Sequence, residues 1–234
     1  MSSQRRTNHG ATRDAQAAAR QLHTRGRGDG TPPSLADVQA YFDGYWNLET
    51  SNRPIRFGDK DTKESLLELA CRMLEVLHKN QEPGTEIVAV EQSFDVPLID
   101  LDTGEVLDRA LVGTLDLVER DAEGRVVVVD LKTSTRKYTD PQVEASLRLS
   151  VYSYPTAMNG LADQEDLRLR FDVLTKTRQL EFYRYWTQRD RAASLRLFRL
   201  AAEVLHANEA GVFHPNPGWQ CKDCQFRSSC WAWR

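Results

Sequence analysis

An acid and an amine follow directly after a run of four valines. Residues 126–129 are all valine, and Asp130 and Lys132 come next. Side chains two residues apart in a strand share a face, so Asp130 and Lys132 should point the same way. Such a pair can hold a hard metal ion and stabilise charge on a phosphate, or it can form an ordinary ion pair at a strand end. The pattern alone fits both interpretations.

A second carboxylate falls into register with this pair. The segments on either side of a short turn read as two antiparallel strands, and pairing Arg120 with Val126 places Asp116 opposite Asp130. Directly opposite Cβ atoms lie about 4.5–5.5 Å apart, and two carboxylates that close repel unless they share a proton or a cation. The hairpin therefore predicts a carboxylate pair suited to Mg²⁺ or Mn²⁺.

Hydrophobic periodicity places these residues in a mixed α/β core with the order α-β-β-β-α-β. Within the second strand, alternation puts Leu115 and Leu117 on one face and Asp116 on the other. The expected helices are 34–48, 60–80, 141–158 and 189–211. The expected strands are 86–99, 105–120 and 125–133, and 167–187 reads as one or two further strands with a bend near 175–178.

The composition fits one globular domain with an N-terminal appendage. Of the 234 residues, 40% are hydrophobic and 28% charged, as in soluble proteins. The sequence shows no apolar run near the roughly 18 residues of a membrane span and no signal peptide, so we expect a cytoplasmic protein. Residues 1–32 hold six arginines against two acids and are expected to be a disordered basic tail, followed by the folded core over residues 33–212.

Three of the four cysteines cluster near the C-terminus. Cys221, Cys224 and Cys230 form a C-x2-C-x5-C pattern, which is typical of a soft-metal site in an intracellular protein. Residues 213–234 are therefore expected to form a Cys-rich, metal- or cluster-binding tail packed on the core.

The fourth ligand of this site has several candidates. Zn²⁺ could take His214 or His206, whereas a 4Fe–4S cluster needs a fourth thiolate, for which Cys71 is the remaining cysteine. Cys71 also fits a buried position within its helix, where a free thiol packs like a small apolar side chain.

The stretch "VGTLDLVERDAEGRVVVVDLKTS" resembles the core of the PD-(D/E)XK nuclease superfamily in its RecB-like branch, which includes the AddB, CRISPR-associated and phage RecB-like exonucleases. The resemblance covers roughly residues 33–234. It implies a restriction-endonuclease-like αβββαβ fold and a metal-dependent phosphodiesterase acting on DNA. It also implies that Asp116, Asp130 and the Leu131 carbonyl hold Mg²⁺ or Mn²⁺ and that Lys132 is the catalytic lysine.

Two features of the chain depart from that branch. The branch carries Q-x-x-x-Y on the helix after the lysine strand, and this chain reads "RLSVY", with Arg148 in place of Gln and Tyr152 retained. Both are candidate DNA contacts, since arginine binds phosphate. The branch also often has a His or Glu on the helix before the first strand. The candidates for this third metal ligand are Glu64 and Glu68, together with Glu91 on the first strand.

The cysteine tail also resembles that branch. There, a C-terminal C-x2-C-x5-C joins an upstream cysteine around a 4Fe–4S cluster, which favours the cluster over Zn²⁺ here. Relatives tend to carry the upstream cysteine near the position where this chain reads "AYFDGYW", whereas Cys71 lies later.

The resemblance implies an exonuclease that acts on single-stranded DNA or free ends in repair, recombination or phage DNA metabolism. It implies recombination, helicase, CRISPR or phage proteins as partners and no membrane. The alternative is a catalytically weak nucleic-acid-binding subunit built on the same fold, because the glutamine is replaced and no third acid stands out.

Overall fold

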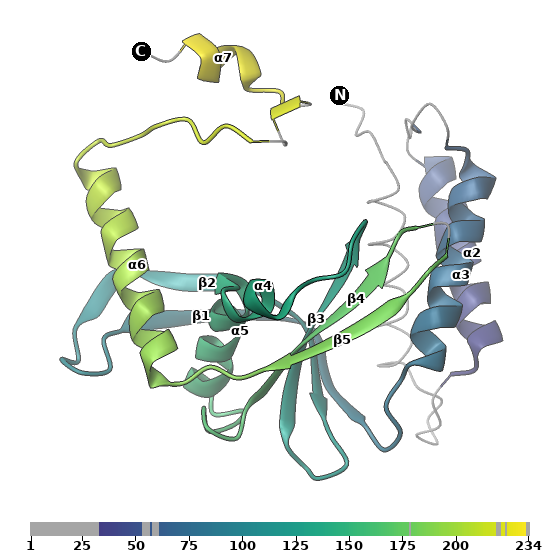
Figure 1. Ribbon diagram of the computed structural model, residues 1–234, viewed down its shortest axis with the longest axis horizontal. Coiled ribbons are helices and arrows are strands. Elements are labelled where there is room, and N and C mark those ends of the chain that lie inside the picture. The colour runs from purple at the N-terminus through teal and green to yellow at the C-terminus, as the bar shows by residue number, and fades with distance from the viewer. Residues whose placement is uncertain are drawn as a thin grey trace.

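The computed structural model describes residues 33–52, 57, 61–177, 179–218, 221–222 and 224–232, so the expected basic tail 1–32 lies outside the described residues. Figure 1 labels the elements. The helices are α2 (Leu35–Asn52), α3 (Lys63–Lys79), α4 (Asp140–Glu144), α5 (Leu147–Met158), α6 (Arg191–Glu209) and α7 (Arg227–Ala232). The strands are β1 (Glu86–Ile99), β2 (Val106–Arg120), β3 (Val126–Ser134), β4 (Arg168–Thr175) and β5 (Phe182–Thr187).

The five strands form one mixed sheet in the order β1-β2-β3-β4-β5. All neighbours are antiparallel except β3 and β4, which run parallel because α4 and α5 cross over between them. The predicted α/β class is confirmed. The predicted hairpin register is also confirmed, since Arg120 pairs with Val126 and the β2–β3 ladder runs on to Leu117 opposite Val129.

One expected helix is divided in two. The sequence predicts a single helix over 141–158, but α4 ends after one turn, where the Ala145 N–H donates to the Pro141 carbonyl. Ser146 then takes an extended backbone conformation (φ −69°, ψ 110°), and α5 begins at Leu147. The break redirects the chain, so that the first turn of α5 lies beside the sheet.

The valine run separates two apolar clusters. Val126 and Val128 pack in the main core with Leu149 and Tyr152 of α5, whereas Val127 and Val129 pack in a smaller cluster on the opposite face. All four valines are buried. Because this alternation continues along β3, Asp130 faces the α5 side of the sheet.

The alternation expected along β2 is interrupted at Asp116. Leu115 packs in the main core, but Leu117 packs in the smaller cluster, so the prediction that these leucines share a face is wrong. The pairs Gln92–Leu115 and Val90–Leu117 flank the break, and Glu91 between them has a positive φ of 49°. A left-handed backbone is uncommon for a residue other than glycine, and here it marks the point at which the two strands change face.

Charged side chains are buried on the opposite face of the sheet from α5. Arg170 is 3% exposed; its Nη2 donates to Glu119 Oε2 at 2.7 Å, and its Nε lies 3.1 Å from Asp172 Oδ1. Arg184 donates to both Asp172 and Glu82, which ties β5 to the connection between α3 and β1. This rear-face ion network therefore links three strands to the helical part of the chain.

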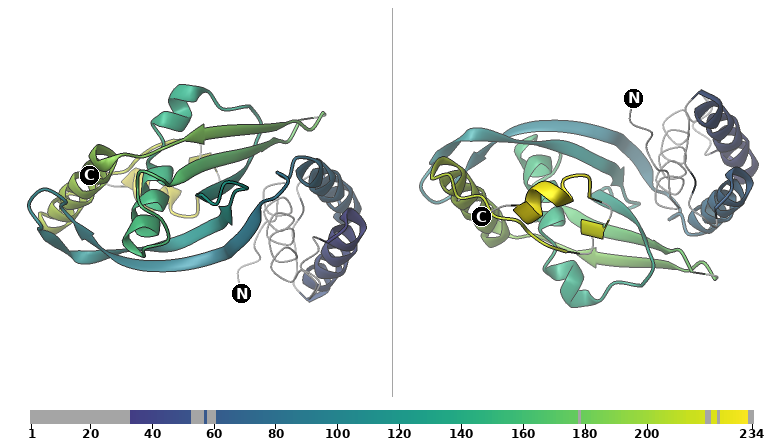
Figure 2. Two further views of the ribbon diagram at one scale, coloured as in Figure 1. Left: turned by 90° about the horizontal axis from the view of Figure 1, so that it is seen from below. Right: turned by 90° about the horizontal axis from the view of Figure 1, so that it is seen from above.

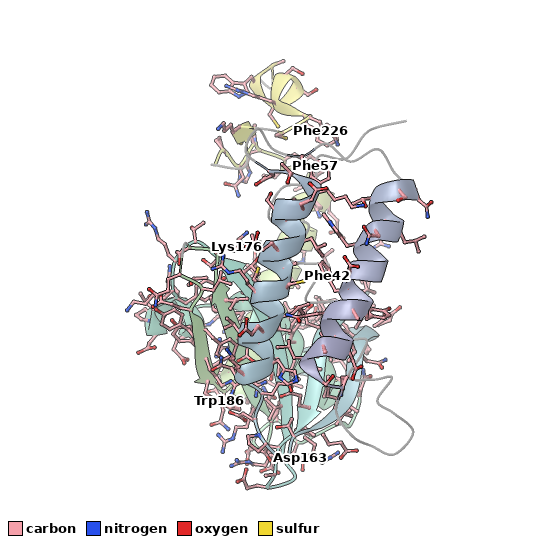
Figure 3. All side chains as sticks on the ribbon, turned by 90° about the vertical axis from the view of Figure 1, so that its right-hand side faces the viewer. Phe42, Phe57, Asp163, Lys176, Trp186 and Phe226 are labelled. Atoms are coloured by element: carbon pink, nitrogen blue, oxygen red, sulfur yellow. The ribbon has the colours of Figure 1, made fainter. Side chains whose placement is uncertain are left out.

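Helices α2 and α3 form a pair that stands to one side of the sheet (Figures 1 and 2). Thr62 caps α3 as expected, with its side chain accepting the Ser65 N–H. Phe42 is fully buried between the two helices and stacks on Trp46 at 6.1 Å (Figure 3). The pair therefore has an apolar core of its own.

The C-terminal segment extends from the end of α6, beyond Gly211 (Figure 1). Most of the described residues in 212–232 are exposed, including Phe226 and Trp231. The expected packing of this tail on the core stays a prediction. Within the described part of the chain, no helix is both long and apolar enough to span a membrane.

Replacing Arg170 by alanine should destabilise the fold strongly. The change removes the ion pair of the buried Glu119 carboxylate and leaves Asp172 with Arg184 as its remaining counter-charge, and breaking such a buried network costs about 3–5 kcal/mol. Urea unfolding followed by circular dichroism measures the loss. Arg125→Ala is the control, because Arg125 forms exposed ion pairs in a turn and its loss should cost less than about 1 kcal/mol. Equal losses in the two variants would contradict a stabilising role for the rear-face ion network.

Candidate functional site: a carboxylate pair beside α5

Asp130 is a fully buried carboxylate with two cations against it. The Lys132 Nζ lies 2.7 Å from Oδ1, and the Arg148 Nε of α5 lies 3.1 Å from Oδ2. Burying a charged group without compensation is costly, so these cations explain how the carboxylate is tolerated in the middle of β3. Asp130 and Lys132 point to the same side, as the spacing in the sequence predicts.

Asp116 reaches the same point from β2. The β2–β3 ladder ends one pair earlier, at Leu117 and Val129, but the Asp116 carboxyl lies within hydrogen-bonding distance of the Asp130 carboxyl. Burial and the neighbouring Asp116 carboxyl together raise the pKa of Asp130 to about 7, against the opposing charge of Lys132. The two carboxyls therefore share a proton near neutral pH unless a cation replaces it.

The oxygens of this pair can bind a cation. Within the described residues, Asp130 Oδ2 is buried and accepts no hydrogen bond, because the nearby Arg148 N–H is not directed at it. An unsatisfied carboxylate oxygen beside a second carboxylate fits a hard divalent ion, which binds oxygen. Leu131 lies between Asp130 and Lys132 in β3, with its side chain packed against the smaller cluster on the other face.

Arg148 and Tyr152 lie one turn apart on α5, next to the carboxylate pair. Arg148 Nη2 donates to the Tyr152 hydroxyl at 3.3 Å, and the guanidinium lies 5.5 Å from the ring centroid. Tyr152 is buried, and burial together with the charges of Asp130 and Asp116 raises its pKa to about 12. The phenol therefore stays protonated and can donate a hydrogen bond at neutral pH.

Tyr138 is a neighbour of the site that the sequence analysis missed. Burial raises the pKa of its phenol, and the charge of Asp130 adds to the rise, which places it near the carboxylate pair. Its ring meets Phe171 edge-on at 5.6 Å, and its carbonyl accepts the Tyr185 hydroxyl. The signal in the sequence was an aromatic residue in the polar segment directly after the lysine strand.

The three candidate glutamates do not join the carboxylate pair. Glu64 and Glu68 are exposed on α3, and Glu91 is exposed on β1 at the point where β1 and β2 change face. Across the part of the chain that the structure describes, no three His, Cys, Asp or Glu side chains are grouped closely enough to hold a metal ion. A third protein ligand thus stays a prediction.

The cysteines are likewise not assembled into one site within the described residues. Cys221 and Cys224 lie in a tight turn, in which the Gly218 N–H donates to the Cys221 sulfur at 3.3 Å and the Cys224 N–H to the Cys221 carbonyl. Cys230 is exposed in α7. Cys71 lies in α3, where burial, and then Asp43, raises the pKa of its thiol.

The chain is similar to one protein family and to two solved structures. A family model described as the PD-(D/E)XK nuclease superfamily matches residues 15–231. No curated protein matches the chain. The solved structure of SSO0001 is 17% identical over 94% of this chain and 96% of that one, with a TM-score of 0.40. A candidate exonuclease from Eubacterium rectale is 13% identical over 98% of this chain and 88% of that one, with a TM-score of 0.45.

The raised pKa of Asp130 predicts a pH-dependent stability of the metal-free protein. The folded state holds a proton on Asp130 up to about pH 7, whereas the unfolded chain loses it near pH 3.8. The free energy of unfolding should therefore fall as pH rises between these values, by up to about 1.4 kcal/mol per pH unit from this group. Urea unfolding in EDTA at a series of pH values measures it.

Asp130→Asn should remove this part of the pH dependence, because asparagine carries no titrating proton. Asp108→Asn is the matched control, since Asp108 is an exposed acid on the same hairpin. If the unfolding free energy of the Asp130→Asn variant changed with pH as steeply as that of the original protein, the pH dependence would come from other groups.

Proposed function

The chain belongs to the PD-(D/E)XK nuclease superfamily, and on that premise we propose that it is a divalent-metal-dependent deoxyribonuclease, an exonuclease of the RecB-like branch. The observation that carries the proposal is the convergence of Asp116, Asp130 and Lys132 at one point of the sheet, with Asp130 fully buried. Buried carboxyls with strongly raised pKa values are typical of functional sites rather than of surface ion pairs.

Asp116, Asp130 and the Leu131 carbonyl would hold Mg²⁺ or Mn²⁺. When bound, the metal ion supplies a Lewis acid for the phosphate and a water molecule of lowered pKa. The unsatisfied Asp130 oxygen supports this assignment. Of the three glutamates, Glu91 is the best-placed third ligand, because it lies on β1 between the pairs that flank Asp116.

The chain's own cations would bind the substrate. Lys132 is held by its 2.7 Å contact with Asp130 and can donate its remaining N–H groups to a phosphate oxygen. The Arg148 side chain is half exposed and positively charged, so it can hold a neighbouring phosphate of the strand. Tyr152 orients Arg148 through their hydrogen bond.

One observation favours the second candidate, a nucleic-acid-binding subunit without strong catalysis. Lys132 and Arg148 together already place two positive charges against Asp130, which can balance the carboxylate pair without a metal ion. In that case the same surface would bind phosphates but would not activate water.

We also propose that the C-terminal cysteines hold a structural 4Fe–4S cluster, with Zn²⁺ as the alternative. The turn that contains Cys221 and Cys224 supports a soft-metal site, because the Gly218 N–H donates to the Cys221 sulfur and such hydrogen bonds orient metal ligands. Cys230 would be the third ligand and Cys71 the candidate fourth.

Removing the carboxylate pair or the lysine should abolish nuclease activity. We expect Asp116→Asn, Asp130→Asn and Lys132→Ala each to lower the rate by at least about a hundredfold, because each removes a group that holds the metal or the developing charge. The measurement is cleavage of end-labelled single- and double-stranded DNA with Mg²⁺ or Mn²⁺. Product lengths in the same gels separate exonuclease from endonuclease action.

Asp108→Asn is again the control and should keep full activity, since Asp108 is exposed on β2. Full activity in the Asp116 and Asp130 variants would contradict the nuclease proposal. An original protein that binds DNA in the presence of Mg²⁺ or Mn²⁺ but does not cut it would favour the binding subunit instead.

Anaerobic purification of the full chain should yield a brown protein that contains iron and acid-labile sulfide in equal amounts. Cys224→Ser should remove the colour, because it removes one thiolate of the cluster. Cys71→Ser should do the same if Cys71 is the fourth ligand and should leave the colour unchanged if another group is. A colourless protein that contains zinc would assign the site to Zn²⁺.

A further inference from the structure

Arg148 contacts the carboxylate oxygen of Asp130 that accepts no hydrogen bond among the described residues. Its Nε lies 3.1 Å from Oδ2, whereas Oδ1 accepts a hydrogen bond from the Lys132 ammonium at 2.7 Å. The Lys132 contact is a directed hydrogen bond, and the Arg148 contact is an attraction between charges alone. Of the two cations, Arg148 is therefore the one that can leave Asp130 without breaking a hydrogen bond to it.

The surroundings of Arg148 give its side chain room to move. The side chain is 49% exposed, compared with 23% for Lys132. It also lines a groove of about 420 Å³ between α5 and residues 112–114 of β2. Tyr152, one turn further along α5, contacts the guanidinium through a 3.3 Å hydrogen bond and through its ring. Because the side chain is long and half in water, it can turn from Asp130 toward the groove.

A cation at Oδ2 opposes the binding of another cation by the same carboxyl pair. Asp116 and Asp130 carry at most two negative charges, and Lys132 and Arg148 already place two positive charges beside Asp130. Arg148 repels a divalent ion at these oxygens, because both cations would bind the same carboxylate. While Arg148 lies against Asp130, the affinity of the pair for Mg²⁺ or Mn²⁺ is therefore lowered.

A phosphate of the substrate gives Arg148 a second anionic partner. A guanidinium forms two parallel, charge-assisted hydrogen bonds with a phosphate, and these are stronger than an undirected contact with a carboxylate. Because one guanidinium cannot align with both anions, a phosphate that binds Arg148 draws it away from Asp130 Oδ2. The bound strand then leaves this oxygen open to a metal ion.

We propose that Arg148 exchanges partners, from Asp130 in the free protein to a phosphate in the complex, so that the DNA strand and the metal ion bind cooperatively. The inference rests on the proposed function of the carboxylate pair and adds the coupling between its two ligands. Each ligand raises the affinity for the other by the same factor. A protein of this kind completes its metal site mainly when a strand is bound.

The experiment measures the affinity for Mn²⁺ with and without a DNA strand. Electron paramagnetic resonance detects free Mn²⁺ during titration of the full chain, alone and with a saturating phosphorothioate oligonucleotide whose intact length is checked on a gel. The coupling is the factor by which the oligonucleotide raises the Mn²⁺ affinity. In the original protein we expect at least about a tenfold rise, the effect of one charge-assisted contact.

The Arg148→Gln variant should bind Mn²⁺ about tenfold more tightly without DNA, and its coupling should fall by the same factor, because no cation remains to be exchanged. Any coupling from direct contact between the metal ion and the strand stays in both proteins and cancels in the comparison. Arg148→Lys should behave like the original protein, since it keeps the positive charge.

Arg125→Gln is the matched control. Arg125 is 44% exposed and its Nε lies 2.8 Å from an aspartate, Asp121, but the pair lies in the turn between β2 and β3. This variant should change neither the Mn²⁺ affinity nor the coupling. Asp130→Asn should abolish tight Mn²⁺ binding, which assigns the measured site to the carboxyl pair.

Four results would overturn the exchange: no coupling in the original protein, equal coupling in Arg148→Gln, an Arg148→Lys variant that behaves like Arg148→Gln, or tight Mn²⁺ binding that survives Asp130→Asn. The nuclease proposal is separated from it by cleavage of unmodified DNA. Coupling that depends on Arg148 without cleavage would contradict the nuclease and support the exchange. Cleavage with coupling that does not depend on Arg148 would support the nuclease and overturn the exchange.

Discussion

The structure depends on the burial of one carboxylate, that of Asp130. Asp130 follows the buried valine run in the middle of β3, where its charge needs compensation. Lys132 on the same strand and Arg148 on α5 supply positive charge, whereas Asp116 on β2 adds a second carboxyl. A pKa near neutrality follows, because burial and the second carboxyl outweigh the two cations. Because the two cations do not fully offset burial and the second carboxyl, the carboxyl pair can also bind a divalent ion.

The hairpin of β2 and β3 decides whether the two carboxyls meet. A slip of one residue would turn Asp116 to the other face, so the register that pairs Arg120 with Val126 is a condition of the site. Beyond Leu117, β2 leaves β3 and changes face together with β1 at Glu91. That departure also leaves residues 112–114 of β2 without a β3 partner, and they border α5 instead.

The two faces of the sheet differ in how fully their buried charges are paired. On the α5 face, the charges of the acid pair and its cations are close to balance but leave one carboxylate oxygen without a hydrogen bond among the described residues. On the rear face, Arg170 and Arg184 bind the carboxylates of Glu119, Asp172 and Glu82 closely and hold β2, β4 and β5 to the chain that follows α3. The rear-face ion network can therefore hold the strands in place while one carboxylate oxygen on the α5 face has no hydrogen bond.

The sequence by itself determined the element types, the hairpin register, the buried valine strand and the shared face of Asp130 and Lys132, because these depend on local periodicity and on one short turn. Only the tertiary structure decided that the helix after β3 breaks at Ser146 and that Leu115 and Leu117 pack in different clusters. It also decided that Tyr138 lies near the two acids and that Arg148 contacts Asp130. These features arise where elements distant in the sequence meet, and their contacts depend on backbone changes such as the positive φ of Glu91, which no periodicity encodes.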